Sequence, residues 1–334
     1  MADVAAAAGV SAMTVSRALR RPDSVSGEVR ARVEEASRRL GFVPSRVASA
    51  LASARSMTVA VLIPSLTNAV FIDLLAGVQE TLSPQGYQPL IGITGYGPEE
   101  EERVLRAQLA HDPDGVILTG LDHTPGTWDL LRGLTVPVVH TMDLIAESGH
   151  GDCPVRTVGF SQFDAGYAIG AHLAARGRRR IGLIAGQLDP RTRRRCDGWR
   201  QALRDAGRHD PALELMVPDA TSVALGAELL ERALAAHPET DALFLCNDDL
   251  AQGALFRCAR LGIPVPERLA VAGFNDLAGA AWTVPPLTTV ATPRRAIGVE
   301  AARLLIAGME DSTQSRDEPR SVDLGFRLMV RETT

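Results

Sequence analysis

The sequence predicts a small all-α head followed by an α/β body made of two doubly wound lobes with parallel sheets. Helix caps and helix breakers divide residues 1–56 into short helices. Beyond them, short apolar runs alternate with amphipathic stretches, which is typical of parallel strands covered by helices. This alternation continues for roughly 275 residues, more than one ordinary doubly wound domain needs, and therefore favours two lobes in tandem.

The head is expected to contain three helices. Residues 3–8 and 12–20 form the first two. A turn separates them, because Gly9 tolerates positive φ and Ser11 can cap the helix that follows. Ser26 then caps a third helix, whose apolar residues recur at helical spacing: Val29, Val33, Ala36 and Leu40.

The body is expected to begin with a strand and to alternate from there. The apolar runs that predict strands are 58–64, 115–118, 136–139, 180–185, 242–246 and 269–274. The amphipathic stretches that predict helices are 71–82, 99–109, 165–176, 193–206, 226–235 and 248–261. Because the strands are apolar on both faces, we expect helices on both sides of each sheet.

Net charge is unevenly distributed along the chain. Residues 1–56 contain nine arginines and five acidic residues, a net charge of +4, and the remainder carries −9 of the total of −5. A basic head on an acidic body indicates that only the head binds a polyanion.

Several protein classes are disfavoured. No apolar run reaches the ~18–20 residues that cross a bilayer, and no basic segment followed by an apolar stretch opens the chain, so we expect a cytoplasmic protein. No Walker A loop, G-x-S-x-G, H-E-x-x-H or Cys/His pair is present, which argues against an enzyme, a cofactor or a metal site. We expect the cysteines to be free thiols: Cys153, Cys196, Cys246 and Cys258.

Two helices joined by a short glycine-containing turn have the helix-turn-helix shape that places one helix in the major groove of DNA. On the second helix, Thr14 and Ser16 suit phosphates, and Arg17 can donate to both acceptor atoms of a guanine. Simple packing of an alanine-rich helix pair stays open as an alternative. The residues of this segment that would contact DNA are Ser11, Ala12, Met13, Thr14, Ser16 and Arg17.

The string DVAAAAGVSAMTVSRALR, followed by LGFVPSRVASAL, resembles the head and hinge of the LacI/GalR family of bacterial repressors. The resemblance runs from Asp3 to about Ser53 and implies a homodimer that binds double-stranded operator DNA. It also implies that residues 45–52 form a hinge helix on DNA, with Leu51 wedged into the minor groove and Arg46 and Ala48 in contact beside it.

One departure from the family lies at the start of the chain. The family usually carries a threonine and an aliphatic residue shortly before the aspartate that matches Asp3, whereas only Met1 and Ala2 precede it here. The first helix is therefore expected to lack a side-chain cap worth about 1 kcal/mol. Either translation starts further upstream or the chain binds DNA weakly.

The body resembles the periplasmic-binding-protein-like sensor of the same family from about Thr58 onward. The resemblance implies a head at 1–44, a hinge helix and linker at 45–57, and an effector-binding and dimerisation domain at 58–334. Within that domain the first lobe is expected at about 58–156 and 288–318, and the second at about 157–287 and 319–334. A solute-binding protein with the same body would need an export signal and would lack the basic head.

Ligands of open parallel sheets bind between lobes at the carboxyl ends of strands, where this sequence places polar residues. Each has a plainer alternative: Asp189 and Asp248 could cap helices, Phe71 could belong to the core, and His123 could lie on a surface loop. The expected effector contacts are Ser65, Phe71, His123, Thr124, Asp164, Arg191, Arg195, Asn247 and Asn275.

The strings PSLTNAVF, HTPGT and LDPRT resemble the branch of the family that regulates gluconate operons. This implies a sugar-acid effector, whose carboxylate would pair with Arg195 or, as second choice, Arg191. An amide at Asn275, where many relatives carry aspartate, suits an anion. A neutral sugar or purine effector, a corepressor protein, and a ligand that promotes DNA binding all stay open.

Overall fold

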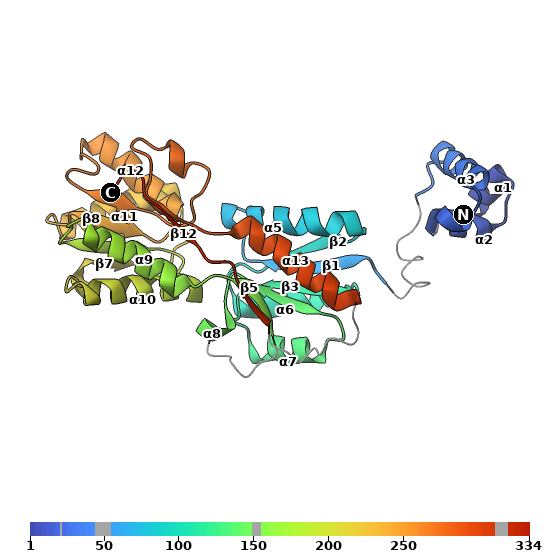
Figure 1. The fold of residues 1–334 in the computed structure, drawn as a ribbon, viewed down its shortest axis with the longest axis horizontal. Helices are drawn as coiled ribbons and strands as arrows, with labels where there is room; N and C mark the ends of the chain where they lie inside the picture. Colours follow the sequence, from blue (N-terminus) through green and yellow to red (C-terminus); the bar gives the residue numbers. More distant parts are fainter. Residues whose placement is uncertain (21, 44–54, 149–154, 311–319) are drawn as a thin grey trace. The chain divides into compact units, whose positions relative to one another are not determined.

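The structure is a computed structural model that describes residues 1–20, 22–43, 55–148, 155–310 and 320–334. These residues form two compact units, Met1–Met57 and Thr58–Thr334, which are described separately (Figure 1). The expected hinge helix and its DNA contacts Arg46, Ala48 and Leu51 lie outside the described residues.

The first unit has the three predicted helices: α1 (Ala2–Ala8), α2 (Ala12–Arg20) and α3 (Gly27–Arg39), with a short 3-10 turn (Pro22–Ser24) between the last two. Gly9 ends α1 with φ 63°, and Ser26 caps α3 by accepting from the backbone N–H of Val29. As expected, α1 has no side-chain cap. The helices enclose a small core of Val4, Ala5, Ala8, Val15, Ala18, Val33 and Ala36.

The second unit begins with a lobe built on a six-stranded parallel sheet of order β11-β5-β4-β3-β1-β2. Its strands are β1 (Thr58–Ile63), β2 (Gln88–Ile93), β3 (Gly115–Thr119), β4 (Val138–Thr141), β5 (Arg156–Gly159) and β11 (Arg320–Asp323). Its helices are α5 (Ala69–Leu82), α6 (Pro98–Leu109), α7 (Pro125–Gly133), α8 (Ile145–Ser148) and α13 (Arg294–Glu310). Helices α5 and α13 lie side by side because Gly77 and Gly298 let the two backbones approach (Figure 1).

The other lobe is built on a four-stranded parallel sheet of order β7-β6-β8-β9. Its strands are β6 (Ile181–Ala185), β7 (Glu214–Met216), β8 (Ala242–Leu245) and β9 (Ala270–Ala272). Its helices are α9 (Gln162–Ala175), α10 (Pro190–Asp205), α11 (Val223–Ala236) and α12 (Asp248–Leu261). Short 3-10 turns lie at Pro211–Leu213 and Ala280–Trp282, and a third, Ser83–Gln85, lies in the first lobe.

The chain crosses between the lobes after β5, after β10 (Thr289–Ala291) and after β11, and it ends on β12 (Arg327–Met329), which pairs with β10. These crossings differ from the expected lobe boundaries, because the first lobe includes all of β5 and β11 whereas β10 lies with the second lobe. Strands β5 and β11 pair with each other in the first lobe, and β10 is bridged to Asn275 of the second lobe through Ala291. Apolar periodicity identifies a strand but not the sheet that a short crossing strand joins.

No helix within the described parts of the chain is both long and apolar enough to cross a membrane.

Candidate functional site

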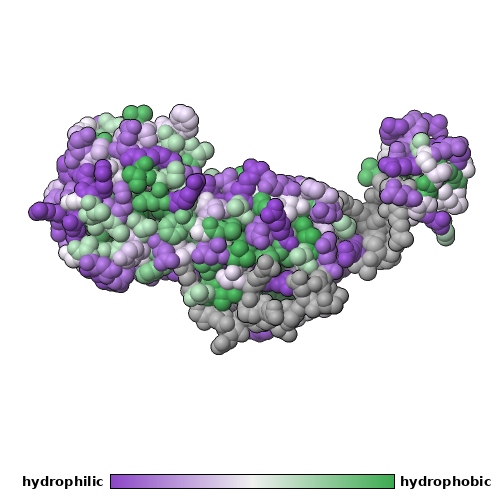
Figure 2. Space-filling view, in the orientation of Figure 1, coloured by the Kyte–Doolittle hydropathy of each residue, from purple (hydrophilic) through white to green (hydrophobic). Residues whose placement is uncertain are grey.

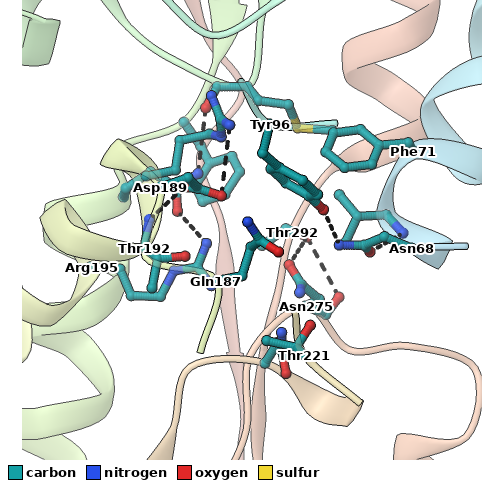
Figure 3. Close-up of a pocket in the computed structure, with 16 residues that line it drawn as sticks. Asn68, Phe71, Tyr96, Gln187, Asp189, Thr192, Arg195, Thr221, Asn275 and Thr292 are labelled. Carbon is teal, nitrogen blue, oxygen red and sulfur yellow. Dashed lines mark hydrogen bonds and ion pairs between the residues drawn. The ribbon is translucent and has the colours of Figure 1, made fainter. Parts of the chain in front are cut away.

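A cavity opens between the two lobes at the carboxyl ends of their strands (Figure 3). The space between its walls is about 540 Å³, part of it open to solvent. Its walls are Asn68, Val70, Phe71, Tyr96, Met142, Phe160, Gln162, Gln187, Asp189, Arg191, Thr192, Arg195, Thr221, Asn247, Asn275 and Thr292.

Backbone strain gathers at this cavity. Tyr96, Met142 and Gln187 have positive φ of 64°, 72° and 49°, and Asn275 has φ 110°. A non-glycine residue in such a conformation costs on the order of 1–3 kcal/mol, and this cost is usually tolerated where a backbone turn aims a side chain at a ligand. All four residues line the cavity, which marks it as the functional site of the unit.

Arg195 is a buried cation on the cavity wall. Its Nη2 donates to Oε1 of Gln162 at 2.9 Å, its Nη1 donates to the backbone carbonyl of Cys246, and its guanidinium lies 3.8 Å from the ring centre of Phe274. Burial lowers the pKa of this guanidinium. Among the described residues its Nε has no hydrogen-bond partner, and no carboxylate forms an ion pair with it.

Arg191 lies in a different electrostatic setting one helical turn earlier. Its guanidinium is 3.4 Å from Asp122, 3.6 Å from Asp143 and 3.7 Å from Asp189. Burial opposes the charged form, but the three carboxylates outweigh it and raise the pKa of Arg191. Arg191 is therefore paired with carboxylates within the protein, whereas no carboxylate of the described residues lies within ion-pair distance of Arg195 and Asp189 acts on it only from further away.

The rest of the wall supplies neutral hydrogen-bonding groups and the carboxylate of Asp189. The amide of Asn68 donates to the hydroxyl of Tyr96 at 3.0 Å (Figure 3). Asp189 and Asn247 cap α10 and α12 by accepting from the backbone N–H groups of Thr192 and Leu250. Asp189 is thus both a helix cap and a cavity residue, so capping the helix does not exclude a contact with the ligand.

The structure brings five of the expected effector contacts to the cavity: Phe71, Arg191, Arg195, Asn247 and Asn275. Four others are not among its walls. Ser65 bonds to Thr67, and Asp164 is exposed on the first turn of α9. Thr124 caps α7, because its hydroxyl accepts from the N–H group of Thr127.

His123 is the fourth expected contact that lies elsewhere. It is buried in the first lobe, with its Nδ1 2.5 Å from Oε1 of Glu101 and its ring 4.9 Å from that of Trp128. The polar residues that follow β3 therefore serve local packing and helix capping, which the order of residues along the chain does not distinguish from ligand binding.

Several cavity residues were not expected from the sequence, three of them for the same reason. The apolar runs did not predict strands β2, β7 and β10. The residues that follow these strands were therefore not expected at the site: Tyr96, Thr221 and Thr292. Gln162 follows β5, where Asp164 and not Gln162 was the expected contact, and Gln187 follows the predicted strand 180–185. The positive φ of Gln187 places it in the cavity, and no feature of the sequence reports that angle.

In the head, α2 turns the predicted DNA contacts away from the core. Val15 and Ala18 are buried, whereas Met13 is 70% exposed and Arg17 is exposed on the opposite side of the helix. Ser11 caps the helix by accepting from the N–H of Thr14 at 3.1 Å. Ala12 is also exposed, and Thr14 and Ser16 are partly exposed, so none of these side chains is buried in the core of the head.

Comparison of the sequence and structure with known proteins identifies the family of this chain. The model of the lacI family of bacterial regulatory proteins matches residues 1–45, and the periplasmic binding protein-like domain matches residues 171–334. HTH-type transcriptional regulator GntR of Pseudomonas aeruginosa is 48% identical over 332 residues, covering 99% of this chain and 94% of that protein. The chain belongs to the lacI family. GntR of Escherichia coli is 38% identical over 98% of this regulator and 96% of its own length.

Solved structures agree with the fold of this lacI-family regulator. GntR of Chromobacterium violaceum, 52% identical, covers 83% of this chain and 98% of its own with a TM-score of 0.77. The lac repressor dimer bound to operator and an anti-inducer, 25% identical, covers 99% of this chain and 98% of its own with a TM-score of 0.85. The regulator is a DNA-binding transcriptional repressor with a two-lobed sensor.

Asp248 of the regulator is a buried carboxyl behind the cavity, not a helix cap. It accepts from the N–H of Leu277 at 2.6 Å and from the hydroxyl of Thr289 at 2.7 Å. Burial raises its pKa from 3.8 to about 7, against the lowering effect of these hydrogen bonds. It joins α12 to the loop of Asn275 and to the crossing strand β10.

The raised pKa of Asp248 predicts a pH dependence of stability. The folded state binds this proton more tightly than the unfolded state, so the contribution is full below pH 3.8 and is lost as the pH rises through about 7, at about 1.4 kcal/mol per unit. Asp248→Asn cannot ionise, so its unfolding free energy relative to wild type should increase from pH 5 to pH 8. Urea unfolding at both pH values measures this, and a constant difference contradicts it.

Proposed function

We propose that the regulator represses transcription as a homodimer whose operator affinity is set by a gluconate-like sugar acid bound between its lobes. The uncompensated charge of Arg195 carries this proposal. A buried cation without a carboxylate partner is costly, and an anionic ligand that supplies one recovers that cost. The protein would act in the cytoplasm, where its operator DNA lies.

The polar groups of the cavity wall suit the groups of a sugar acid. A carboxylate next to Arg195 gains a charge-assisted pair and can also accept from the amide of Asn275. Asp189, which lines the cavity beside Arg191, would repel an anion and instead accept hydrogen bonds from ligand hydroxyls. Asn68 and Gln187 add further polar partners for a polyol chain.

Other effectors fit these walls less well. A neutral sugar would leave the charge of Arg195 buried and unpaired. A planar base would need parallel aromatic faces, but the rings of Phe71 and Tyr96 are 6.2 Å apart and meet edge to face at 63°. The charge of the site therefore favours a sugar acid over a neutral sugar or a purine.

The decisive experiment measures operator binding by the full-length protein at several salt concentrations, with gluconate, glucose or adenine added. Gluconate should change operator affinity while the neutral sugar and the base do not. By linkage, operator DNA should change gluconate affinity by the same factor. A protein that binds no DNA near its own gene in a salt-sensitive manner, or that responds equally to glucose, would contradict the proposal.

Exposed apolar side chains on the second lobe support a homodimer. Trp282 is 84% exposed and Val284 is 89% exposed, and the visible face of this lobe carries further hydrophobic areas among hydrophilic ones (Figure 2). Large exposed aromatic residues are typical anchors of protein interfaces. The lac repressor, which has the same fold, is a dimer on its operator.

Trp282→Arg is expected to weaken dimerisation by about 30-fold, because truncating an aromatic anchor costs on the order of 2 kcal/mol. Sedimentation at graded concentrations measures the monomer–dimer equilibrium. Val223→Arg, at a less exposed apolar residue at the start of α11, is the control and should leave the equilibrium unchanged. Equal dimerisation by Trp282→Arg and wild type would place the interface elsewhere.

A further inference from the structure

Beside the cavity, two arginines of the second lobe meet two carboxylates of the first. Nη1 of Arg194 lies 2.8 Å from Oδ1 of Asp143, and Nη1 of Arg191 lies 3.4 Å from Asp122 and 3.6 Å from Asp143. Both arginines belong to the first turns of α10, whereas Asp122 follows β3 and Asp143 follows β4. The ion pairs therefore connect α10 of the second lobe with the ends of β3 and β4 in the first lobe. The polypeptide itself links the two lobes only through the crossing segments.

These pairs are largely shielded from solvent. The side chain of Asp143 is 0% exposed, that of Arg191 is 8% exposed and that of Arg194 is 22% exposed. Burial raises the pKa of Asp143, and the two arginines oppose that effect. In such surroundings ions are poorly screened by salt, and removing one partner leaves the other charge buried without compensation.

The Arg194–Asp143 pair lies where it can act on the cavity without belonging to its wall. Arg194 and Asp143 are not among the cavity walls, although their neighbours Met142, Thr192 and Arg195 are. Separation of the lobes would break the Arg194–Asp143 pair, whereas a rotation that keeps the lobes together preserves it. The cost of separating the lobes thus includes the loss of these ion pairs.

We propose that Arg191, Arg194, Asp122 and Asp143 form an interlobe latch that favours the closed sensor and thereby sets the affinity of the cavity for its effector. Arg191 accordingly acts as a part of this latch and not as the anchor of the effector carboxylate. The expected change in effector affinity rests on the proposed sugar-acid function, whereas the expected change in lobe closure does not.

The latch can be tested on Arg194, which has no place on the cavity wall. Arg194→Gln should shift the ligand-free sensor toward the open state. If the closed fraction falls to about a tenth, the gluconate dissociation constant should rise about tenfold. Arg193→Gln removes the same charge from the neighbouring exposed residue and should leave the constant within about twofold. Titration calorimetry on the full-length chain measures both.

Two further measurements separate a latch from a general loss of structure. Asp143→Asn should have the same direction of effect, and the double variant should be weakened by less than the product of the two single effects. Distances between spin labels at Asp129→Cys and Glu228→Cys, in a Cys153→Ser background diluted with unlabelled protein, report closure directly. The two labelled residues are exposed, with side chains 74% and 63% accessible.

The outcomes are distinguishable. A longer ligand-free interlobe distance in Arg194→Gln than in Arg193→Gln supports the latch, and an unchanged distance overturns it. If wild type binds gluconate and Arg194→Gln binds it equally well, the latch is also wrong. If wild type binds no sugar acid at all, the proposed effector class fails while the distance measurement still decides the latch.

Discussion

Arg195→Gln is expected to lower gluconate affinity by at least about 30-fold, the largest single effect on ligand binding in this regulator. Loss of one partner of a buried charge pair typically costs 2–5 kcal/mol or more, and each 1.4 kcal/mol is a factor of about ten. The ligand-free protein should stay folded, because the variant removes a buried charge that no carboxylate compensates. Titration calorimetry and thermal unfolding of the same samples measure the two quantities.

Two further variants on the same helix serve as controls for this test. Arg195→Lys keeps the charge but loses the planar donors, so its affinity should lie between those of wild type and Arg195→Gln. Arg193→Gln controls for a change of net charge on the same helix. If Arg195→Gln binds gluconate normally while Arg191→Gln does not, the carboxylate lies at the other end of the cavity and the assignment of the two arginines must be exchanged.

Gly198→Ala is expected to destabilise the second lobe by about 3 kcal/mol or more. A Cβ atom at Gly198 would overlap the backbone carbonyl of Phe163, and Gly166 meets the backbone of Arg195 in the same way from the opposite helix. Overpacking against backbone costs typically 1–3 kcal/mol and more where nothing can yield, and here neither α9 nor α10 can move without displacing Arg195.

Chemical denaturation measures the loss, and Gly133→Ala is the matched control. Gly133 ends α7 in open space, with no atom within 4 Å of the added methyl, so its substitution should change stability by less than about 0.5 kcal/mol. If Gly198→Ala were as stable as Gly133→Ala, helices α9 and α10 would have to be further apart than the structure places them. Effector affinity should also fall in Gly198→Ala, because Arg195 shares the displaced helix.

Much of the fold could be read from local patterns. The caps at Ser26 and Gly9, the apolar strands and the amphipathic helices follow from nearest-neighbour chemistry, and the structure has them where they were expected. The strands that were missed are those with weak local signals. Strand β2 lies at a sheet edge with Ile91 and Ile93 partly exposed, and β7 has only three residues.

The residues of the candidate site likewise divide into those that the sequence predicts and those that it does not. Arg195, Asn247 and Asn275 follow well-marked strands or begin well-marked helices, so their place at the cavity could be inferred. His123 and Thr124 occupy an equivalent place in the sequence, yet nearby side chains of the first lobe engage them. Only the positions of those partners decide whether a polar residue at a strand end turns toward the ligand or into its own lobe.

The sequence by itself determined the basic helix-turn-helix head, the acidic two-lobed body and the family to which both belong, because caps, periodicity and charge act over a few neighbouring residues. The tertiary structure alone decided that Arg191 is compensated and Arg195 is not. That distinction depends on Asp122 and Asp143, which act beside the neighbouring Asp189, lie far from Arg191 in the chain and reach it only across the lobe boundary. Coulomb energy depends on distance in space and on burial, and neither is a property of the order of residues.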